Sequence, residues 1–203
     1  MTKSILLVGV GGQGTILASK LLTLGLMEAG YDIKMSEIHG MSQRGGSVSS
    51  QVRYSKEKVY SPVIEIGGAD MIVSFEKMEA LRYLKYLKLD GKIVANNYRM
   101  DSVSTLVGNF EYKEKEIDEK LNELNATVVD AAKKAEELGN LKVMNVILLG
   151  SLVRSMNLEH INWEYIIRKN VKEKFIDLNI KAFEEGLKLV GHKIDATAYI
   201  KFN

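Results

Sequence analysis

Cysteine is absent from this sequence of 203 residues, and histidine occurs only three times. Without cysteine the chain forms no disulfide, offers no thiol for catalysis and cannot ligate an iron–sulfur cluster through its own thiolates. His39, His160 and His192 lie far apart in the sequence, which argues against a zinc site built on this chain alone. We therefore expect no metal site in this chain.

Excess charge and long apolar runs are also lacking. The formal net charge is +2, so neither nucleic acid nor a membrane surface is indicated as a partner. The first apolar run, residues 5–10, is interrupted by Gly9 and is followed by two more glycines. It is too short for a signal segment or a membrane span. We expect a cytoplasmic protein without a membrane partner.

Proline occurs once, at Pro62, and the sequence contains no internal repeat, low-complexity segment or linker. Apolar residues make up 46% of the chain and charged residues 27%, which is usual for a soluble globular protein. The length suits one sizeable domain and is short for two. We therefore expect residues 1–203 to form a single domain.

Short apolar or alternating segments predict strands, and segments with helical spacing lie between most of them. The predicted strands cover residues 4–10, 32–38, 47–54, 70–75, 92–95 and 126–129. The predicted helices cover residues 14–30, 77–87, 117–124, 141–156 and, in one or two pieces, 163–190.

This alternation predicts an α/β fold, with a Rossmann-like, mostly parallel sheet, helices on both of its faces and a helical C-terminal part. Residues 55–58 are predicted to turn the chain into Val59 and Tyr60, so that a β-hairpin is inserted into the sheet. Ligands bind such sheets outside the carboxyl ends of the strands. That edge should bring together residues 9–14, 36–46, 75–76 and 96–97.

A glycine-rich turn follows the first predicted strand. Its sequence, GVGGQG, fits the G-x-G-x-x-G pattern, in which glycines let backbone N–H groups approach a phosphate at a helix N-terminus. Glu37 stands roughly where a dinucleotide site has its ribose-binding acid. The alternative is that the glycines only permit close packing of strand and helix. The candidate cofactor-binding residues are Gly9, Gly11, Gly12, Gln13 and Gly14.

A second loop, residues 36–47, combines a carboxylate, an imidazole, an amide and a guanidinium with three glycines. Arg44 can present a planar pair of donors to a carboxylate or phosphate. His39 can transfer a proton near neutral pH or simply anchor the loop. The alternative for the whole segment is a flexible polar loop. His39 and Arg44 are the catalytic candidates, and the further binding candidates are Ser36, Glu37, Gln43, Gly45 and Gly46.

Together, GVGGQG and SEIHGMSQRGGSV resemble the small (beta) subunit of indolepyruvate:ferredoxin oxidoreductase, which is related to the gamma domain of 2-oxoacid:ferredoxin oxidoreductases. The loop HGMSQRGG favours the indolepyruvate branch over gamma subunits that act on other oxoacids. The resemblance extends from residue 5 to about residue 190. Its supporting matches are residues 68–70, 75–76, 79–82, 137–140, 145–150 and 179–186.

The resemblance implies oxidative decarboxylation of an aryl-2-oxoacid to its acyl-CoA, with electrons passed to ferredoxin. Thiamine diphosphate and the iron–sulfur clusters would belong to the large (alpha) subunit, so this chain would carry no cofactor and would be inactive alone. Coenzyme A would be the co-substrate, and the glycine turn is a candidate for one of its phosphates. The loop from His39 to Gly46 would reach the active site.

Several alternatives remain open at this point. The chain could be the gamma subunit of another 2-oxoacid:ferredoxin oxidoreductase, a self-sufficient NAD(P)-dependent reductase, or a non-catalytic assembly or regulatory module that keeps the fold. Glu76 could bind a ligand hydroxyl, but it is better placed to cap the helix that follows it. Trp163 could belong to the core or to a subunit interface.

Overall fold

The computed structural model describes residues 1–39, 45–101 and 111–191, and in these ranges it contains one sheet of six strands in the order β2-β3-β1-β4-β5-β6. The strands are β1 Lys3–Val10, β2 Asp32–His39, β3 Ser47–Ser55, β4 Ala69–Ser74, β5 Leu87–Asn96 and β6 Thr127–Val129.

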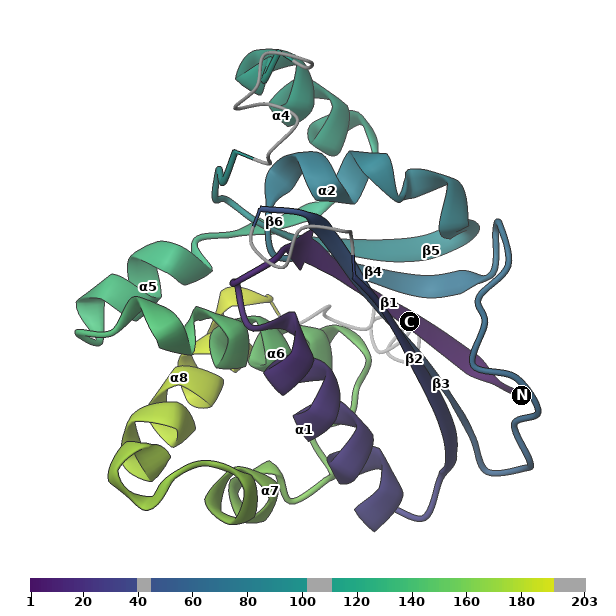
Figure 1. Cartoon of the computed structure of the whole chain (residues 1–203), viewed down its shortest axis with the longest axis vertical. Helices are drawn as coiled ribbons and strands as arrows, with labels where there is room; N and C mark the ends of the chain where they lie inside the picture. The colour runs from purple at the N-terminus through teal and green to yellow at the C-terminus, as the bar shows by residue number, and fades with distance from the viewer. Residues whose placement is uncertain (40–44, 102–110, 192–203) are drawn as a thin grey trace, which may run out of the picture.

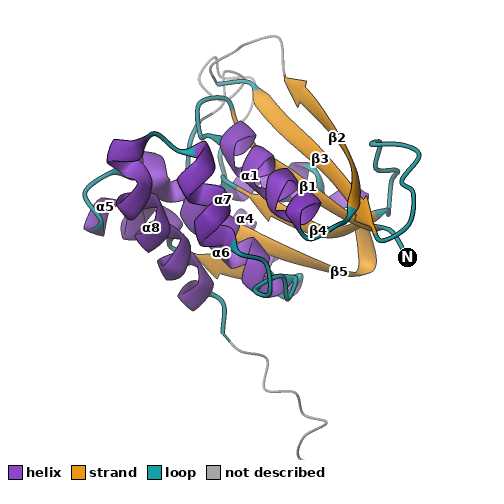
Figure 2. Cartoon of the chain, turned by 90° about the horizontal axis from the view of Figure 1, so that it is seen from below, coloured by secondary structure: helices purple, strands orange, loops and turns teal. Residues whose placement is uncertain are grey.

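Helices cover both faces of this sheet (Figure 1). One face carries α2 Lys77–Arg82 and α4 Glu114–Glu123. The other face carries a thicker layer, which lies on the viewer's side of the sheet in Figure 2, and the predicted fold class is thereby confirmed. This layer consists of α1 Thr15–Glu28, α5 Ala131–Glu137, α6 Met144–Ser155, α7 Trp163–Asn170 and α8 Ile176–Leu189. None of the described helices is long and apolar enough to cross a membrane.

The inserted hairpin is present, but its two strands are not the segments that the sequence predicted. β3 runs antiparallel to β1 on one side and to β2 on the other, with Val10 opposite Ser47 and His39 opposite Val48. Val59 and Tyr60 form no strand. The reason is that a strand has two edges for pairing, and β1 and β2 occupy both edges of β3. The hairpin therefore consists of β2 and β3.

Several element boundaries also differ from the prediction, and one helix was not predicted. The helix predicted over residues 77–87 ends at Arg82, and β5 already begins at Leu87, where it pairs with Ala69 of β4. The helix predicted over residues 141–156 opens with the 3₁₀ turn Leu141–Val143. Helix α5 was not expected, because its buried residues are alanines, whose small side chains give a weak amphipathic signal.

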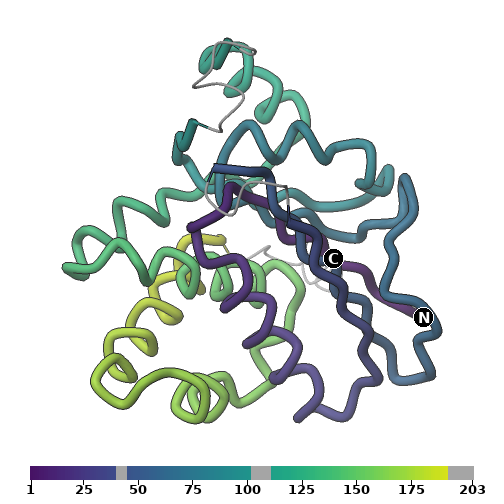
Figure 3. Tube along the Cα trace, in the orientation of Figure 1, coloured from purple at the N-terminus to yellow at the C-terminus, as the bar shows by residue number. Residues whose placement is uncertain are grey.

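The main core lies between the sheet and the thicker helical layer. Residues from Met144 to Val153 are all buried, so α6 lies at the centre of this layer. The N-terminal helix α1 lies beside α6 and α7, which come from the C-terminal half of the chain (Figure 3). Trp163 is buried there against Phe183, with 5.8 Å between the ring centroids, and so contributes to the core rather than to an exposed interface.

Candidate functional site

The carboxyl ends of β1, β2, β4 and β5 meet at one rim of the sheet, as predicted. β2 runs in the same direction as β1, because both are antiparallel to the β3 strand between them. The side chains of Gln13 and Asn96 each donate to the carbonyl oxygen of Phe75, over 3.1 and 3.3 Å. These bonds join the glycine turn, the end of β4 and the end of β5 into a single structure.

The glycine turn leads directly into α1 and presents backbone rather than side chains. Gly12 and Gly14 have φ angles of +106° and +83°, a region that other residues rarely adopt. Gly12 is exposed, and a Cβ atom there would meet no atom within 4 Å. Gly14 is the N-cap of α1, and no side chain in the described part of the chain caps the helix. The positive end of α1 is therefore available to an anion.

Gly9 and Gln13 pack on the buried side of this turn. The Gln13 side chain is only 8% exposed, and its Oε1 accepts a hydrogen bond from the N–H of Val10 at 2.8 Å. A Cβ atom on Gly9 would lie 2.8 Å from that same Oε1 and 2.9 Å from Cβ of Phe75. Gly9 and Gln13 would therefore affect ligand binding by fixing the conformation of the turn.

The second loop is attached to the glycine turn at its C-terminal end. The N–H of Gly11 donates to the carbonyl oxygen of Gly46 at 2.8 Å, and the N–H of Gly45 donates to the carbonyl oxygen of Gly11 at 3.4 Å. Five predicted binding glycines, Gly11, Gly12, Gly14, Gly45 and Gly46, thus belong to one backbone surface. The candidates Gln43 and Arg44 lie outside the described residues.

Ser36, Glu37 and His39 lie near the end of β2. The Glu37 carboxylate accepts a hydrogen bond from Ser19 of α1 at 3.2 Å, and its other oxygen lies 3.7 Å from Nε2 of His39. The His39 side chain is partly exposed. Because neighbouring residues of a strand point to opposite faces, Ser36 and Glu37 cannot both line a site on one face. The structure brings Glu37 and His39 together and leaves Ser36 apart from them.

Glu76 is a helix cap, as predicted. Its carboxylate accepts a hydrogen bond from the N–H of Glu79 at 3.0 Å, at the start of α2. The hydroxyl of Tyr112 donates to the other oxygen at 2.5 Å. The residue is 1% exposed, and burial raises the pKa of its carboxyl above the ordinary value, although the hydrogen bonds from Tyr112 and Glu79 oppose this.

We expect the free energy of unfolding of Glu76→Gln to increase, relative to that of the parent, as the pH rises. The pKa of the Glu76 carboxyl is raised in the folded state. The stability that this carboxyl contributes to the parent is therefore fully present below the ordinary pKa, and it is lost as the pH rises through the raised pKa. A neutral glutamine retains an acceptor for the N–H of Glu79. Urea unfolding at several pH values between about 4 and 7 measures the difference.

The exposed Glu119→Gln is the matched control for this titration, and it should show no such trend. A free energy of unfolding of Glu76→Gln that falls relative to that of the parent as the pH rises would contradict the assignment.

A second buried carboxylate, Glu79, was not recognised from the sequence. Its oxygens accept hydrogen bonds from the Ser47 hydroxyl at 2.5 Å and from Nε of Arg82 at 2.9 Å. Ser47 is the first residue of β3, so this contact ties the end of the second loop to α2. The i,i+3 spacing of Glu79 and Arg82 was visible in the sequence, whereas nothing in it indicated the contact with Ser47, 32 residues away.

Comparison with known proteins identifies the family of this chain. Residues 4–189 match the family described as pyruvate ferredoxin/flavodoxin oxidoreductase. The chain belongs to this family. A relative from Pyrococcus horikoshii, named indolepyruvate oxidoreductase subunit IorB, is 39% identical over 91% of this chain and 94% of its own length. The family resemblance predicted from the two motifs is therefore confirmed.

Two solved structures of oxoacid oxidoreductases share the fold. The gamma subunit of a keto/oxoacid ferredoxin oxidoreductase from Geobacter sulfurreducens aligns with a TM-score of 0.67 at 24% identity, over 92% of this chain and 97% of that one. The 2-oxoglutarate:ferredoxin oxidoreductase of Magnetococcus marinus aligns with a TM-score of 0.71 at 19% identity, over 93% of this chain and 31% of that one. The family fold thus occurs both as a separate chain and within a larger chain.

Proposed function

We propose that this chain is the small, cofactor-free subunit of an indolepyruvate:ferredoxin oxidoreductase. The observation that carries the proposal is the 39% identity, along nearly the whole chain, to a subunit named for indolepyruvate. The complete enzyme would convert an aryl-2-oxoacid to its acyl-CoA in the cytoplasm, releasing carbon dioxide and passing two electrons to ferredoxin. Residues 1–203 would act as a single gamma-type domain, which the family match over residues 4–189 supports.

The cofactors would reside in the partner. A chain without cysteine has no thiolate for an iron–sulfur cluster, and no group of three or more His, Asp or Glu in its described part could hold a metal ion. The large (alpha) subunit would supply thiamine diphosphate and the clusters, and ferredoxin would accept electrons through the complex. The role left for this chain is to bind and orient the substrates.

The backbone surface of Gly11, Gly12, Gly14, Gly45 and Gly46 would bind a phosphate of coenzyme A. Two features support this: no described side chain caps the positive end of α1, and Gly12 leaves space for close approach. The Magnetococcus marinus structure, which shares the fold, contains coenzyme A. Gly9 and Gln13 would hold the turn in the conformation that this contact needs.

The second loop would extend from this surface toward the partner subunit. Its C-terminal end is fixed by the bonds to Gly11 and by the contact between Ser47 and Glu79, so a residue on the loop can be positioned against a neighbouring subunit. Arg44 and Gln43 would bind the substrate carboxylate or coenzyme A. His39, partly exposed and 3.7 Å from a carboxylate oxygen of Glu37, would hold or transfer a proton.

A self-sufficient NAD(P)-dependent reductase is disfavoured by the strand order. A Rossmann dinucleotide site places its acid on the strand beside β1, but here β3 occupies that position and Glu37 lies one strand farther away. The Glu37 carboxylate is also engaged by Ser19 and lies beside His39. A gamma subunit for another oxoacid keeps the same chemistry and differs only in substrate.

Isolation of the native complex tests the proposal. We expect the tagged chain to co-purify with a large, cysteine-rich subunit, and the complex to reduce ferredoxin with indolepyruvate and coenzyme A faster than with pyruvate or 2-oxoglutarate. Preference for either of the other oxoacids would reassign the substrate within the family. Purification of the chain without any large partner would leave the assembly-module or reductase alternative in its place.

A further inference from the structure

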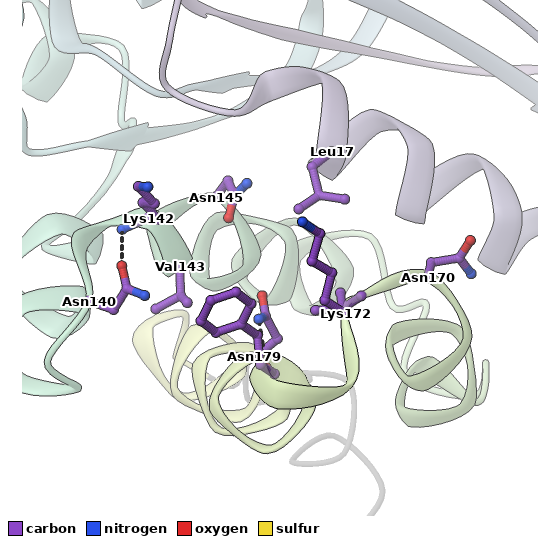
Figure 4. Close-up of a pocket in the computed structure, with 10 residues that line it drawn as sticks. Leu17, Asn140, Lys142, Val143, Asn145, Asn170, Lys172 and Asn179 are labelled. Atoms are coloured by element: carbon purple, nitrogen blue, oxygen red, sulfur yellow. Dashed lines mark hydrogen bonds between the residues drawn. The ribbon is translucent and has the colours of Figure 1, made fainter.

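A cavity separate from the rim lies within the thicker helical layer (Figure 4). It is bounded by α1, by the 3₁₀ turn before α6, and by the segment that joins α7 to α8. Its volume is about 290 Å³, which is near the lower end of the range for small-molecule sites. Among the described residues, none of those predicted to bind in the glycine turn or the second loop lines it.

Asn145, at the start of α6, presents an unused hydrogen-bond acceptor at this cavity. The residue is 5% exposed, and its Nδ2 donates to the carbonyl oxygen of Gly14 at 3.3 Å. The other amide atom, Oδ1, is buried and has no donor among the described residues. Because the Gly14 carbonyl can only accept, the amide cannot be reversed without placing two oxygens together. Figure 4 shows Oδ1 directed toward the space between Lys172 and Val143.

Two lysines give the cavity a positive charge. Lys142 comes from the 3₁₀ turn before α6, and Lys172 follows α7, so they reach the cavity from different elements. Neither forms an ion pair with a described residue, and no carboxylate side chain from the described ranges lines the cavity. An anionic group would therefore be attracted here, without competition from a neighbouring acid.

The remaining surface is largely apolar. Leu17 of α1, Val143 and Phe175 contribute side chains from three sides. A phenyl ring and two aliphatic side chains suit a flat or compact apolar body. The cavity thus combines three features in one space: a positive edge, apolar walls and a buried acceptor.

We propose that this cavity binds a small organic acid whose apolar body carries, away from the carboxylate, an O–H or N–H donor. The carboxylate would lie near Lys142 and Lys172, the body against Leu17 and Phe175, and the donor would bond to Oδ1 of Asn145. The site is independent of the proposed function. Asn145, which would bond to the occupant, also donates to the carbonyl oxygen of Gly14, the N-cap of α1.

Calorimetric titration of the full 203-residue chain with 4-hydroxyphenylacetate tests the proposal. We expect saturable binding at millimolar or lower concentration. Replacing the hydroxyl by a methyl group, in 4-methylphenylacetate, should weaken binding about threefold to tenfold, because Asn145 Oδ1 then has no donor. Removing the charge, in 4-hydroxyphenylacetamide, should weaken it similarly. Inorganic phosphate, an anion without an apolar body, should bind more weakly than all three.

Lysine variants locate the site without disturbing the core. Lys142→Gln and Lys172→Gln should each weaken binding of 4-hydroxyphenylacetate about threefold. Lys181→Gln, an exposed lysine of α8 that does not line the cavity, is the matched control and should have no effect. Absence of saturable binding, equal affinity for the hydroxyl and methyl compounds, or equal effects of all three lysine variants would each overturn the proposal. A failure would leave the proposed function untouched, because none of the described residues assigned to coenzyme A or the substrate lines the cavity.

Discussion

Gly186→Ala should lower the thermal midpoint of unfolding by about 4–8 °C, a loss of about 2 kcal/mol, although alanine is the better helix former. The expectation comes from the crossing of α6 and α8. A Cβ atom on Gly186 would lie 2.0 Å from the carbonyl oxygen of Ile147, and one on Gly150 would lie 2.3 Å from the carbonyl oxygen of Phe183. The obstructing atoms are backbone, so no side-chain rotation can relieve the contact.

Separation of the two helices is the only way to accommodate the methyl group. α6 is buried along Met144–Val153, so a shift of α8 would open gaps in the centre of the helical layer. It would also lengthen the hydrogen bond of 3.0 Å from the Ser151 hydroxyl to the carbonyl oxygen of Gly186. In a solvent-exposed helix the same substitution stabilises by about 1 kcal/mol, so the sign of the effect separates packing from helix propensity.

Gly191→Ala is the matched control, because a Cβ atom there would meet no atom of the described residues within 4 Å. Its midpoint should stay within about 2 °C of the parent. The double variant Gly150→Ala/Gly186→Ala should lose less than the sum of the two single losses, since one separation of the helices accommodates both methyl groups. An unchanged or raised midpoint for Gly186→Ala would show that the helices are not in backbone contact.

The isolated chain should be colourless and should not reduce viologen dyes when it is given indolepyruvate and coenzyme A. The sequence contains no cysteine for a cluster, and decarboxylation of a 2-oxoacid at neutral pH needs an electron sink that side chains of this kind do not provide. Addition of the large subunit should restore both the visible absorbance and dye reduction. We therefore expect no measurable dye reduction by the isolated chain and the full rate only in the presence of the large subunit.

The reciprocal measurement uses the large subunit alone, which should show the absorbance of its clusters but little turnover. Full turnover by the large subunit would reduce this chain to an accessory component. Turnover by this chain without a partner would contradict the proposed function altogether.

Local pattern predicted most of the fold, because strands and helices in an α/β protein are encoded in short segments. The buried runs of β1 and β4 and the alternation of β3 were each visible from their own residues. The partner of β3 was not, because pairing depends on which edges other strands have already occupied. Helix α5 was missed for a related reason: its N-terminal amides are capped by Asn96, 35 and 36 residues away, rather than by a neighbour in sequence.

The candidate site was predicted less completely than the fold. The meeting of the loops at one rim follows from strand direction, and Glu76 was recognised as a cap because a cap needs only its own helix. The hydrogen bonds of Glu79 and Asn145 were not predicted, because their partners, Ser47 and Gly14, are distant in the sequence. Gln13 could not be assigned inward or outward, since a motif shows spacing and not the direction of a side chain.

The position of β3 has a consequence for how the sheet opens. β2 is bonded to the sheet through β3 alone, whereas β1 has a neighbour on each side. In native-state hydrogen exchange, the amides of β2 should therefore belong to a unit of lower stability than those of β1 and β4. A ligand that contacts both the glycine turn and the hairpin would stabilise that unit selectively. Slower hydrogen exchange of the β2 amides would then report that a ligand has bound at the glycine turn.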